Sequence, residues 1–437
     1  MRHDGTSMTS EQRAALFGRT MNRASELRAA ERRRHLAVRT LPTVALALGL
    51  SAAVVAVATT GGGHRHPATS HAAGTGTSTA PRPHATTATS TTSTSTTLPA
   101  PIISGFDPIS FSAVSLAQWW VLGTAPCQSG RCSEVLATSD GGAHFSVHLL
   151  PGTLGQVSGI AFGNSADGFV YGPGLAVTTD GGATWTAESM PGEVSELQIA
   201  GGRADALVRC SPSSAGCQGQ VQLFQNALPG FMLNTPFPGG SWRAVTLPEK
   251  LTFGASLSVQ GTTVLVSNGP ASSTGAQPVD FLLSTDGGSS FSVETSPCNP
   301  GLGGRGELAI SDPAVIWAAC PTGMMASPSL STDAGATWSP VRSSTEFSNG
   351  LDLAPVSATT ALAWPAGGQS GVALTTDGGT SFQTVLTGKT GSFVTFAGYS
   401  DPSRAYVIFS KGTGEKTGLM YESNDGGHTW TQVSFRS

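Results

Sequence analysis

The stretch TTDGGATW at residues 178–185 decides the fold, because near copies of it recur between residues 138 and 430. The five other copies, which together with it are called the octapeptide repeats below, are TSDGGAHF from Thr138, STDGGSSF from Ser284, STDAGATW from Ser331, TTDGGTSF from Thr375 and SNDGGHTW from Ser423. Their aspartates are Asp140, Asp180, Asp286, Asp333, Asp377 and Asp425. Recurrence at a near-constant period indicates one supersecondary unit used several times.

The spacing of the repeats predicts how many units there are. Successive aspartates lie 40 to 48 residues apart, except for an interval of 106 residues between Asp180 and Asp286. That interval contains TPFPGGSW at 235–242, which keeps the glycine and tryptophan positions while Phe237 replaces the aspartate. The chain therefore contains seven units, the third of them degenerate.

Two further strand-like runs precede the repeat in each unit, and in the first of them the apolar residues lie two apart, as in half-buried strands. The first runs are 109–111, 160–162, 197–199, 257–259, 308–310, 351–353 and 394–396. The second runs are 119–122, 168–171, 206–208, 264–266, 315–317, 361–364 and 405–409. With one strand on each side of the repeat, every unit has four strands. Residues 103–437 are thus predicted to form an all-β fold, a seven-bladed β-propeller of four-stranded blades.

The chemistry of the repeat fits a tight turn between the third and fourth strands. Asp, Ser and Thr side chains hydrogen-bond nearby turn amides, and glycine accepts a positive φ. The repeats resemble the Asp-box, or bacterial neuraminidase repeat (S/T-x-D-x-G-x-T/S-W/F), of sialidase-like and sortilin-like β-propellers. The resemblance implies that the six aspartates and the box tryptophans are structural and lie opposite the active face. The tryptophans are Trp185, Trp242, Trp338 and Trp430.

Charge is distributed unevenly over the chain. The net charge is −4, yet residues 1–39 contain nine arginines and only four acidic residues, so the remainder is acidic. An acidic domain without a basic stripe lacks the main electrostatic contribution to phosphate-backbone binding. We therefore expect no nucleic-acid partner.

The N-terminal segment, residues 1–102, predicts attachment to a membrane. Residues 41–60 are uncharged and about long enough for a transmembrane helix, and the preceding arginines place residues 1–40, a basic and partly helical segment, in the cytoplasm. Residues 61–102, rich in Ser, Thr, Pro and Gly, are expected to be a disordered linker. The expected location is the cell membrane, in a single pass with the C-terminal domain outside. The alternative is secretion after signal cleavage near Ala58.

The six cysteines fall into three pairs of near neighbours, as expected for disulfides in an oxidising compartment. The expected pairs are Cys127–Cys132, Cys210–Cys217 and Cys298–Cys320. The four-strand register places all three at the ends of the blades opposite the octapeptide repeats, an end called the stapled face below. A zinc knuckle at Cys127 and Cys132 is the alternative, but no second Cys or His pair lies nearby.

Candidate catalytic groups are few. Carboxylates near the starts of first strands could act as an acid/base pair on a glycosidic bond, although solvated rim charge is the simpler interpretation. The candidates at the mouth of the channel are Asp107, Glu193, Glu196, Arg305 and Glu307. Four further acids are expected to cap turns between first and second strands, namely Asp167, Asp205, Asp312 and Asp401. The arginine triad and tyrosine nucleophile of sialidases have no counterpart in this sequence.

These observations favour a non-catalytic binding or scaffolding propeller over the alternative, a glycoside hydrolase using rim carboxylates. The expected ligand is a protein, a peptide, or a glycan such as a cell-wall polymer, held on the stapled face. No cofactor-binding motif or metal-ligand cluster is present in the sequence, so neither a cofactor nor a metal is expected. We expect a monomer.

Overall fold

The computed structural model describes residues 103–437 with the exception of a few short segments. Those exceptions are residues 129, 201, 215–216, 218, 228–241, 253, 269–279, 299–306, 323–324, 346, 349 and 366–370. The predicted segments 1–40, 41–60 and 61–102 lie outside the described residues, as do Phe237 and Arg305. Within the part that is described, no helix is long and apolar enough to span a bilayer.

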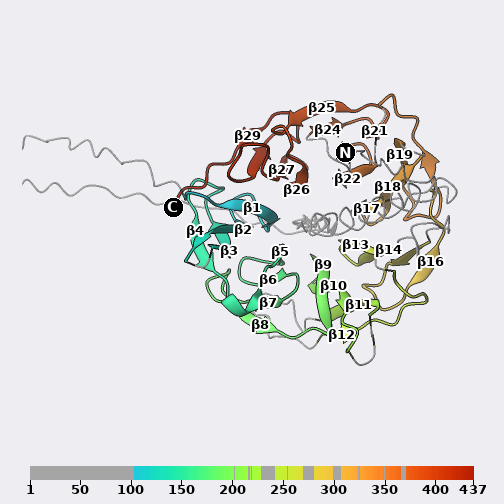
Figure 1. Cartoon of the computed structure of the whole chain (residues 1–437). Helices are drawn as coiled ribbons and strands as arrows, with labels where there is room; N and C mark the ends of the chain where they lie inside the picture. Colours follow the sequence, from blue (N-terminus) through green and yellow to red (C-terminus); the bar gives the residue numbers. More distant parts are fainter. Residues whose placement is uncertain are drawn as a thin grey trace, which may run out of the picture. The chain divides into compact units, whose positions relative to one another are not determined.

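Seven antiparallel sheets follow one another along the chain, each made from consecutive strands (Figure 1). The first strands are β1 (Asp107–Ala113), β5 (Gly159–Phe162), β9 (Gly192–Ala200), β13 (Ser256–Gln260), β17 (Glu307–Asp312), β22 (Leu351–Pro355) and β26 (Val394–Asp401). The second strands are β2 (Trp119–Cys127), β6 (Gly168–Tyr171), β10 (Arg203–Cys210), β14 (Thr263–Ser267), β18 (Val315–Pro321), β23 (Ala361–Pro365) and β27 (Arg404–Phe409). All fourteen predicted first and second runs fall within these strands, so the predicted propeller is confirmed.

The third and fourth strands flank the octapeptide repeats, as predicted. The third strands are β3 (Gly130–Thr138), β7 (Leu175–Thr178), β11 (Val221–Ala227), β15 (Phe281–Ser284), β19 (Met325–Ser331), β24 (Gly371–Thr375) and β28 (Leu419–Ser423). The fourth strands are β4 (Ser146–Leu149), β8 (Thr186–Glu188), β12 (Arg243–Ala244), β16 (Ser292–Glu294), β20 (Ser339–Pro340), β25 (Gln383–Thr387) and β29 (Thr431–Gln432). One short strand, β21 (Phe347–Ser348), adds to β19, and one 3-10 turn, η1 (Gly152–Leu154), follows β4.

Each octapeptide repeat folds into the same hydrogen-bonded turn. The first residue's hydroxyl donates to the aspartate Oδ1 over 2.7–2.9 Å, and the fifth residue's N–H donates to that hydroxyl over 2.8–3.0 Å. The seventh residue's N–H donates to the same Oδ1 over 2.8–3.0 Å. These carboxylates are therefore occupied within their own turns.

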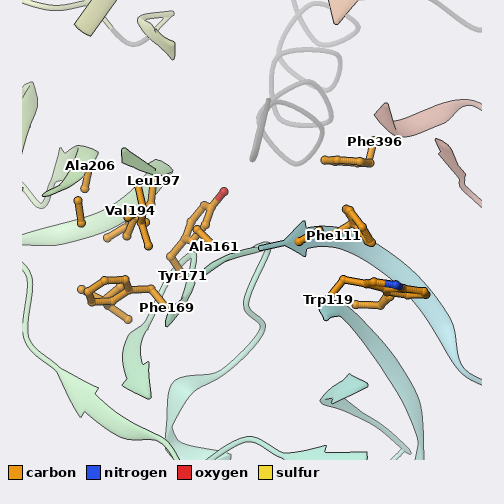
Figure 2. Packing of buried hydrophobic residues seen from close by; sticks show 14 of the residues in the cluster. Phe111, Trp119, Ala161, Phe169, Tyr171, Val194, Leu197, Ala206 and Phe396 are labelled. Atoms are coloured by element: carbon orange, nitrogen blue, oxygen red, sulfur yellow. The ribbon is translucent and has the colours of Figure 1, made fainter. Parts of the chain in front are cut away.

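The hydrophobic core lies between neighbouring blades. In Figure 2, Phe111 and Trp119 of the first blade lie on one side of the largest cluster, with Phe169 and Tyr171 of the second on the other. Phe111 also stacks on Tyr406 of the last blade, with ring centroids 4.1 Å apart. Burial on both faces explains why the second strands carry continuous apolar runs.

The ring closes at a seam between the last blade and the first, where β26 contacts β1. Among the strands that the structure describes, none is exchanged across this seam; instead the closing tail, residues 433–436, runs back onto the first blade. Ile103 N–H donates to the Phe435 carbonyl (3.0 Å), and Phe145 N–H donates to that of Arg436 (2.6 Å). The Phe435 ring packs against Phe106 and Phe145 at centroid distances of 5.1 and 5.3 Å.

Candidate functional site

The three disulfides lie on the stapled face, with the predicted pairing. Cys127–Cys132 closes the β2–β3 hairpin, and Cys210–Cys217 closes the loop after β10. Cys298–Cys320 ties the segment before β17 to the end of β18. No cysteine is free. Cross-links in three separate blades hold loops of one face in place and reduce the conformational freedom lost on binding a ligand.

Asp107, at the start of β1, joins two blades. Its Oδ1 accepts a hydrogen bond of 2.6 Å from the Gly418 N–H of the last blade. The Arg131 guanidinium lies 3.9 Å from its other oxygen. This carboxylate therefore contributes to closing the ring at the stapled face.

Glu196 does not lie at the mouth of the channel, and that prediction is wrong. Glu196 is only 4% exposed, and its Oε2 accepts a hydrogen bond of 2.7 Å from the Leu257 N–H of β13. β9 begins at Gly192, so Glu196 lies in the middle of the strand, level with a bulge in the pairing with β10. The side chain joins the third blade to the fourth.

The remaining candidate carboxylates lie on other parts of the stapled face. Glu193 is exposed and 3.5 Å from Arg209 Nη1. Glu307 begins β17 and is partly buried. Asp107, Glu193 and Glu307 thus belong to the first, third and fifth blades. Among the described residues, no group of three or more His, Cys, Asp or Glu is placed to hold a metal ion.

Glu196 belongs to a set of polar residues on first strands that sequence reasoning missed. Their side chains accept hydrogen bonds from backbone N–H groups of the next blade's first strand, and Gln198 also donates to the Leu257 carbonyl (2.8 Å). The acceptor–donor pairs are Ser112 with Phe162, Glu196 with Leu257, Gln198 with Val259 and Ser258 with Ile310. The signal was present in the sequence, because polar residues alternate with apolar ones along these first strands. These bonds cover strand edges that would otherwise be unpaired.

Two of the four acids predicted to cap turns have another role. Asp312 and Asp401 accept from Ala314 N–H (3.1 Å) and Ser403 N–H (2.8 Å), as predicted. In the turn before Asp167, however, the backbone amides are capped by Asn164, and Asp167 accepts from the Asn164 side chain (2.6 Å).

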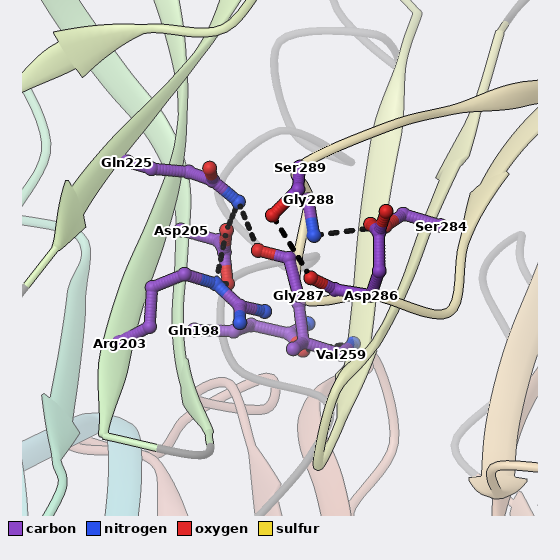
Figure 3. Close-up of polar contacts among 10 residues, drawn as sticks. All are labelled: Gln198, Arg203, Asp205, Gln225, Val259, Ser284, Asp286, Gly287, Gly288 and Ser289. Atoms are coloured by element: carbon purple, nitrogen blue, oxygen red, sulfur yellow. Dashed lines mark hydrogen bonds and ion pairs between the residues drawn. The ribbon is translucent and has the colours of Figure 1, made fainter.

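Asp205 forms a buried ion pair (Figure 3). Arg203 Nε donates to both of its oxygens (3.0 and 2.8 Å), and Gln225 Nε2 donates to Oδ1 (2.6 Å) and to the Gly287 carbonyl of the next blade (3.2 Å). Burial raises the pKa of Asp205 to about 6, against the opposing effects of Arg203 and Gln225. The cluster packs the turn of the third blade against the repeat of the fourth.

A small pocket of about 190 Å³ lies at the seam, on the face of the octapeptide repeats. It is lined by Gly142 and Ala143 of the first repeat, by Glu422 of β28, and by Gln432, Val433, Ser434 and Arg436. Burial raises the pKa of Glu422, and the Arg404 charge opposes that shift. This pocket could not be predicted from the sequence because its walls come from the first and last blades, which lie about 280 residues apart along the chain.

Comparisons with known proteins agree with the fold. No family model and no curated protein matches the chain. An ancestral GH74 enzyme is 15% identical with a TM-score of 0.50, over 77% of this chain and 48% of that one. The acylaminoacyl peptidase of Pyrococcus horikoshii is 8% identical with a TM-score of 0.50, over 75% and 52%. YCF48 bound to D1 peptide is 15% identical with a TM-score of 0.49, over 74% and 94%.

This chain therefore spans about half the length of the GH74 enzyme and of the peptidase. At these identities the likeness concerns the fold alone. The class that fold and comparisons define is the seven-bladed β-propeller.

Proposed function

We propose that this protein is a non-catalytic binding or scaffolding propeller, which engages a protein, peptide or cell-wall polymer through its stapled face. The observation that carries the proposal is the position of the three disulfides, which constrain loops of one face in three parts of the ring. Loops fixed in advance bind with a smaller loss of entropy. On the opposite face, the repeat aspartates are occupied by their own turns.

The glycoside hydrolase alternative is weaker. A carboxylate pair for hydrolysis needs both groups to reach the scissile bond. Glu196 instead accepts a backbone hydrogen bond inside the protein, which leaves Asp107, Glu193 and Glu307 on separate blades. Incubation of the protein with a broad glycan panel tests this alternative directly, and release of oligosaccharides that is lost in Glu307→Gln would revive it.

Site-specific photo-cross-linking tests the binding face. A benzoyl-phenylalanine replacing Ser213, an exposed residue of the loop closed by Cys210–Cys217, is expected to form adducts with the partner in living cells. The same group replacing Ala183, an exposed residue of the second octapeptide repeat, is the matched control on the opposite face. Adducts from position 183 alone would contradict the proposal.

We further propose that residues 41–60 hold the protein in the membrane and that residues 61–102 tether the propeller outside it. The uncharged stretch and its arginine-rich N-terminal flank support this topology. N-terminal sequencing of the exported protein separates it from secretion, for which the mature chain would begin just after Ala58.

A further inference from the structure

The chain has only four lysines, and all four lie on loops of the stapled face. Lys250 lies between β12 and β13, Lys389 between β25 and β26, and Lys411 and Lys416 between β27 and β28. All four are exposed. Loops at the other ends of the blades, where the octapeptide repeats lie, contain none.

Three of these lysines lie on two loops that are bonded to each other. Thr413 N–H donates to the Thr390 carbonyl (2.7 Å), and Ser410 N–H donates to the Phe393 carbonyl (2.8 Å). The Lys389 side chain lies so close to Gly412 that a Cβ there would be 2.8 Å from the Lys389 Cβ. Lys389, Lys411 and Lys416 are therefore held in one surface region, called the lysine patch below.

The lysine patch is a local exception in an acidic domain. Residues 103–437 contain twelve Lys and Arg against 23 Asp and Glu. Within the two loops the one acidic residue is Glu415, so the patch has a net charge of about +2. On the first blade, Asp107 accepts a hydrogen bond from Gly418 at the end of the second loop, and Arg131 lies beside Asp107.

We propose that the lysine patch binds a short acidic segment of a partner protein. This inference rests on the proposed function, since it gives the chemistry of a ligand for the stapled face. A long anionic polymer would extend beyond the patch onto a domain of net negative charge, where it would be repelled. A short segment with a few carboxylates fits within the patch. Glu415 would repel part of any ligand whose negative charges follow one another without a gap.

The test is fluorescence anisotropy on the full chain in mild detergent, with a fluorescein-labelled hexaglutamate peptide as probe. The variant Lys389→Gln/Lys411→Gln/Lys416→Gln is expected to weaken binding about tenfold. The matched control, Arg243→Gln/Lys250→Gln/Arg342→Gln, removes the same charge from three other exposed positions and is expected to weaken binding by less than about threefold. Raising NaCl from about 50 to about 200 mM is expected to weaken binding to the wild type.

Equal effects of the two triple variants would overturn the inference, since net charge alone would then explain binding. Tighter binding of inorganic polyphosphate than of the peptide, at equal charge, would also overturn it in favour of a polymer. If the patch variant retains the Ser213 photo-adducts at the wild-type level, the inference fails while the proposed function stands. Loss of these adducts only in the patch variant supports both.

Discussion

At the scale of single residues, the octapeptide turns differ in how well their fourth residue suits the left-handed backbone conformation that the turn requires. In five repeats the fourth residue is glycine with φ between 71° and 75°, but in the fifth blade it is Ala334 with φ 58°. A non-glycine residue pays a steric cost in this left-handed region. The fifth blade therefore contains the most strained of the described turns.

Replacing Ala334 with glycine is expected to raise the free energy of unfolding by about 0.5 kcal/mol. Relief of the left-handed conformation outweighs the greater entropy of glycine in the unfolded chain. The matched control is Ala336→Gly in the same turn, which is not in the left-handed region and should destabilise by about 0.5 kcal/mol. Urea unfolding of both variants measures the difference, and a loss of stability in Ala334→Gly would refute the argument.

Asp205 is expected to make stability depend on pH between about 4 and about 6. Its pKa is raised from 3.8 to about 6, so the folded protein binds this proton more tightly than the unfolded chain. The contribution of Asp205 to stability is therefore greatest below pH 4 and falls as the pH rises to about 6. Comparing urea unfolding of the wild type and Asp205→Asn across this range measures it, and an unchanged slope in the variant would contradict the assignment.

The repeat aspartates act with the opposite sign and at lower pH. Hydrogen bonds from the Ser290 hydroxyl and N–H lower the pKa of Asp286 to about 2, and Thr337 does the same for Asp333. Their contribution is present above pH 4 and is lost as the pH falls towards 2. Asp205 changes stability between about pH 4 and about pH 6, whereas the repeat aspartates change it between about pH 2 and about pH 4. Because these two pH ranges do not overlap, unfolding measured across both ranges separates the two effects.

At the scale of elements, the seam combines packed first strands with the short closing tail, and among the described strands none is exchanged across it. Phe435 contributes the apolar contact that holds this tail against Phe106 and Phe145. The first strands of other neighbouring blades also pack against each other, and three of those interfaces have the side-chain bonds described above. The share of the closing tail in the stability of the seam can therefore be tested by removing the Phe435 ring.

Phe435→Ala is expected to lower the free energy of unfolding by about 2 kcal/mol and to increase local opening at the seam. Amide hydrogen exchange of Ile103 and Phe145, whose N–H groups bond to the tail, measures that opening. Phe382→Ala is the control: Phe382 packs edge-on against Phe347 (centroids 4.9 Å apart) on another blade. If both variants change exchange at Ile103 and Phe145 alike, the tail has no special role.

At the scale of the whole molecule, a disulfide that closes a longer loop should stabilise the fold more, although the gain grows only with the logarithm of loop length. Cys298 and Cys320 are 22 residues apart, against 5 for Cys127 and Cys132. Loop-closure entropy predicts that replacing the first pair with alanines costs about 3 kcal/mol and the second about 2 kcal/mol. Urea unfolding of the two double variants compares them, and a larger loss for Cys127→Ala/Cys132→Ala would contradict the entropic account.

The sequence was sufficient for the architecture because local patterns determine it. The octapeptide repeats fixed the turns, alternating runs located the strands, and cysteine spacing with strand register gave the disulfides. Glu196 was misplaced because its environment is created by Leu257 of the next blade. The Asp205 cluster, the seam and its pocket were missed for the same reason, since each joins residues whose proximity depends on how blades pack.

The closing tail also determines how the propeller bears mechanical load. Any tension transmitted through the preceding chain enters the described domain at Ile103, whose N–H is bonded to the carbonyl of Phe435. Pulling there strains the seam first, while the other interfaces remain unloaded. The seam of the ring and the point where the force enters thus coincide, so a pulled propeller is expected to open between its first and last blades.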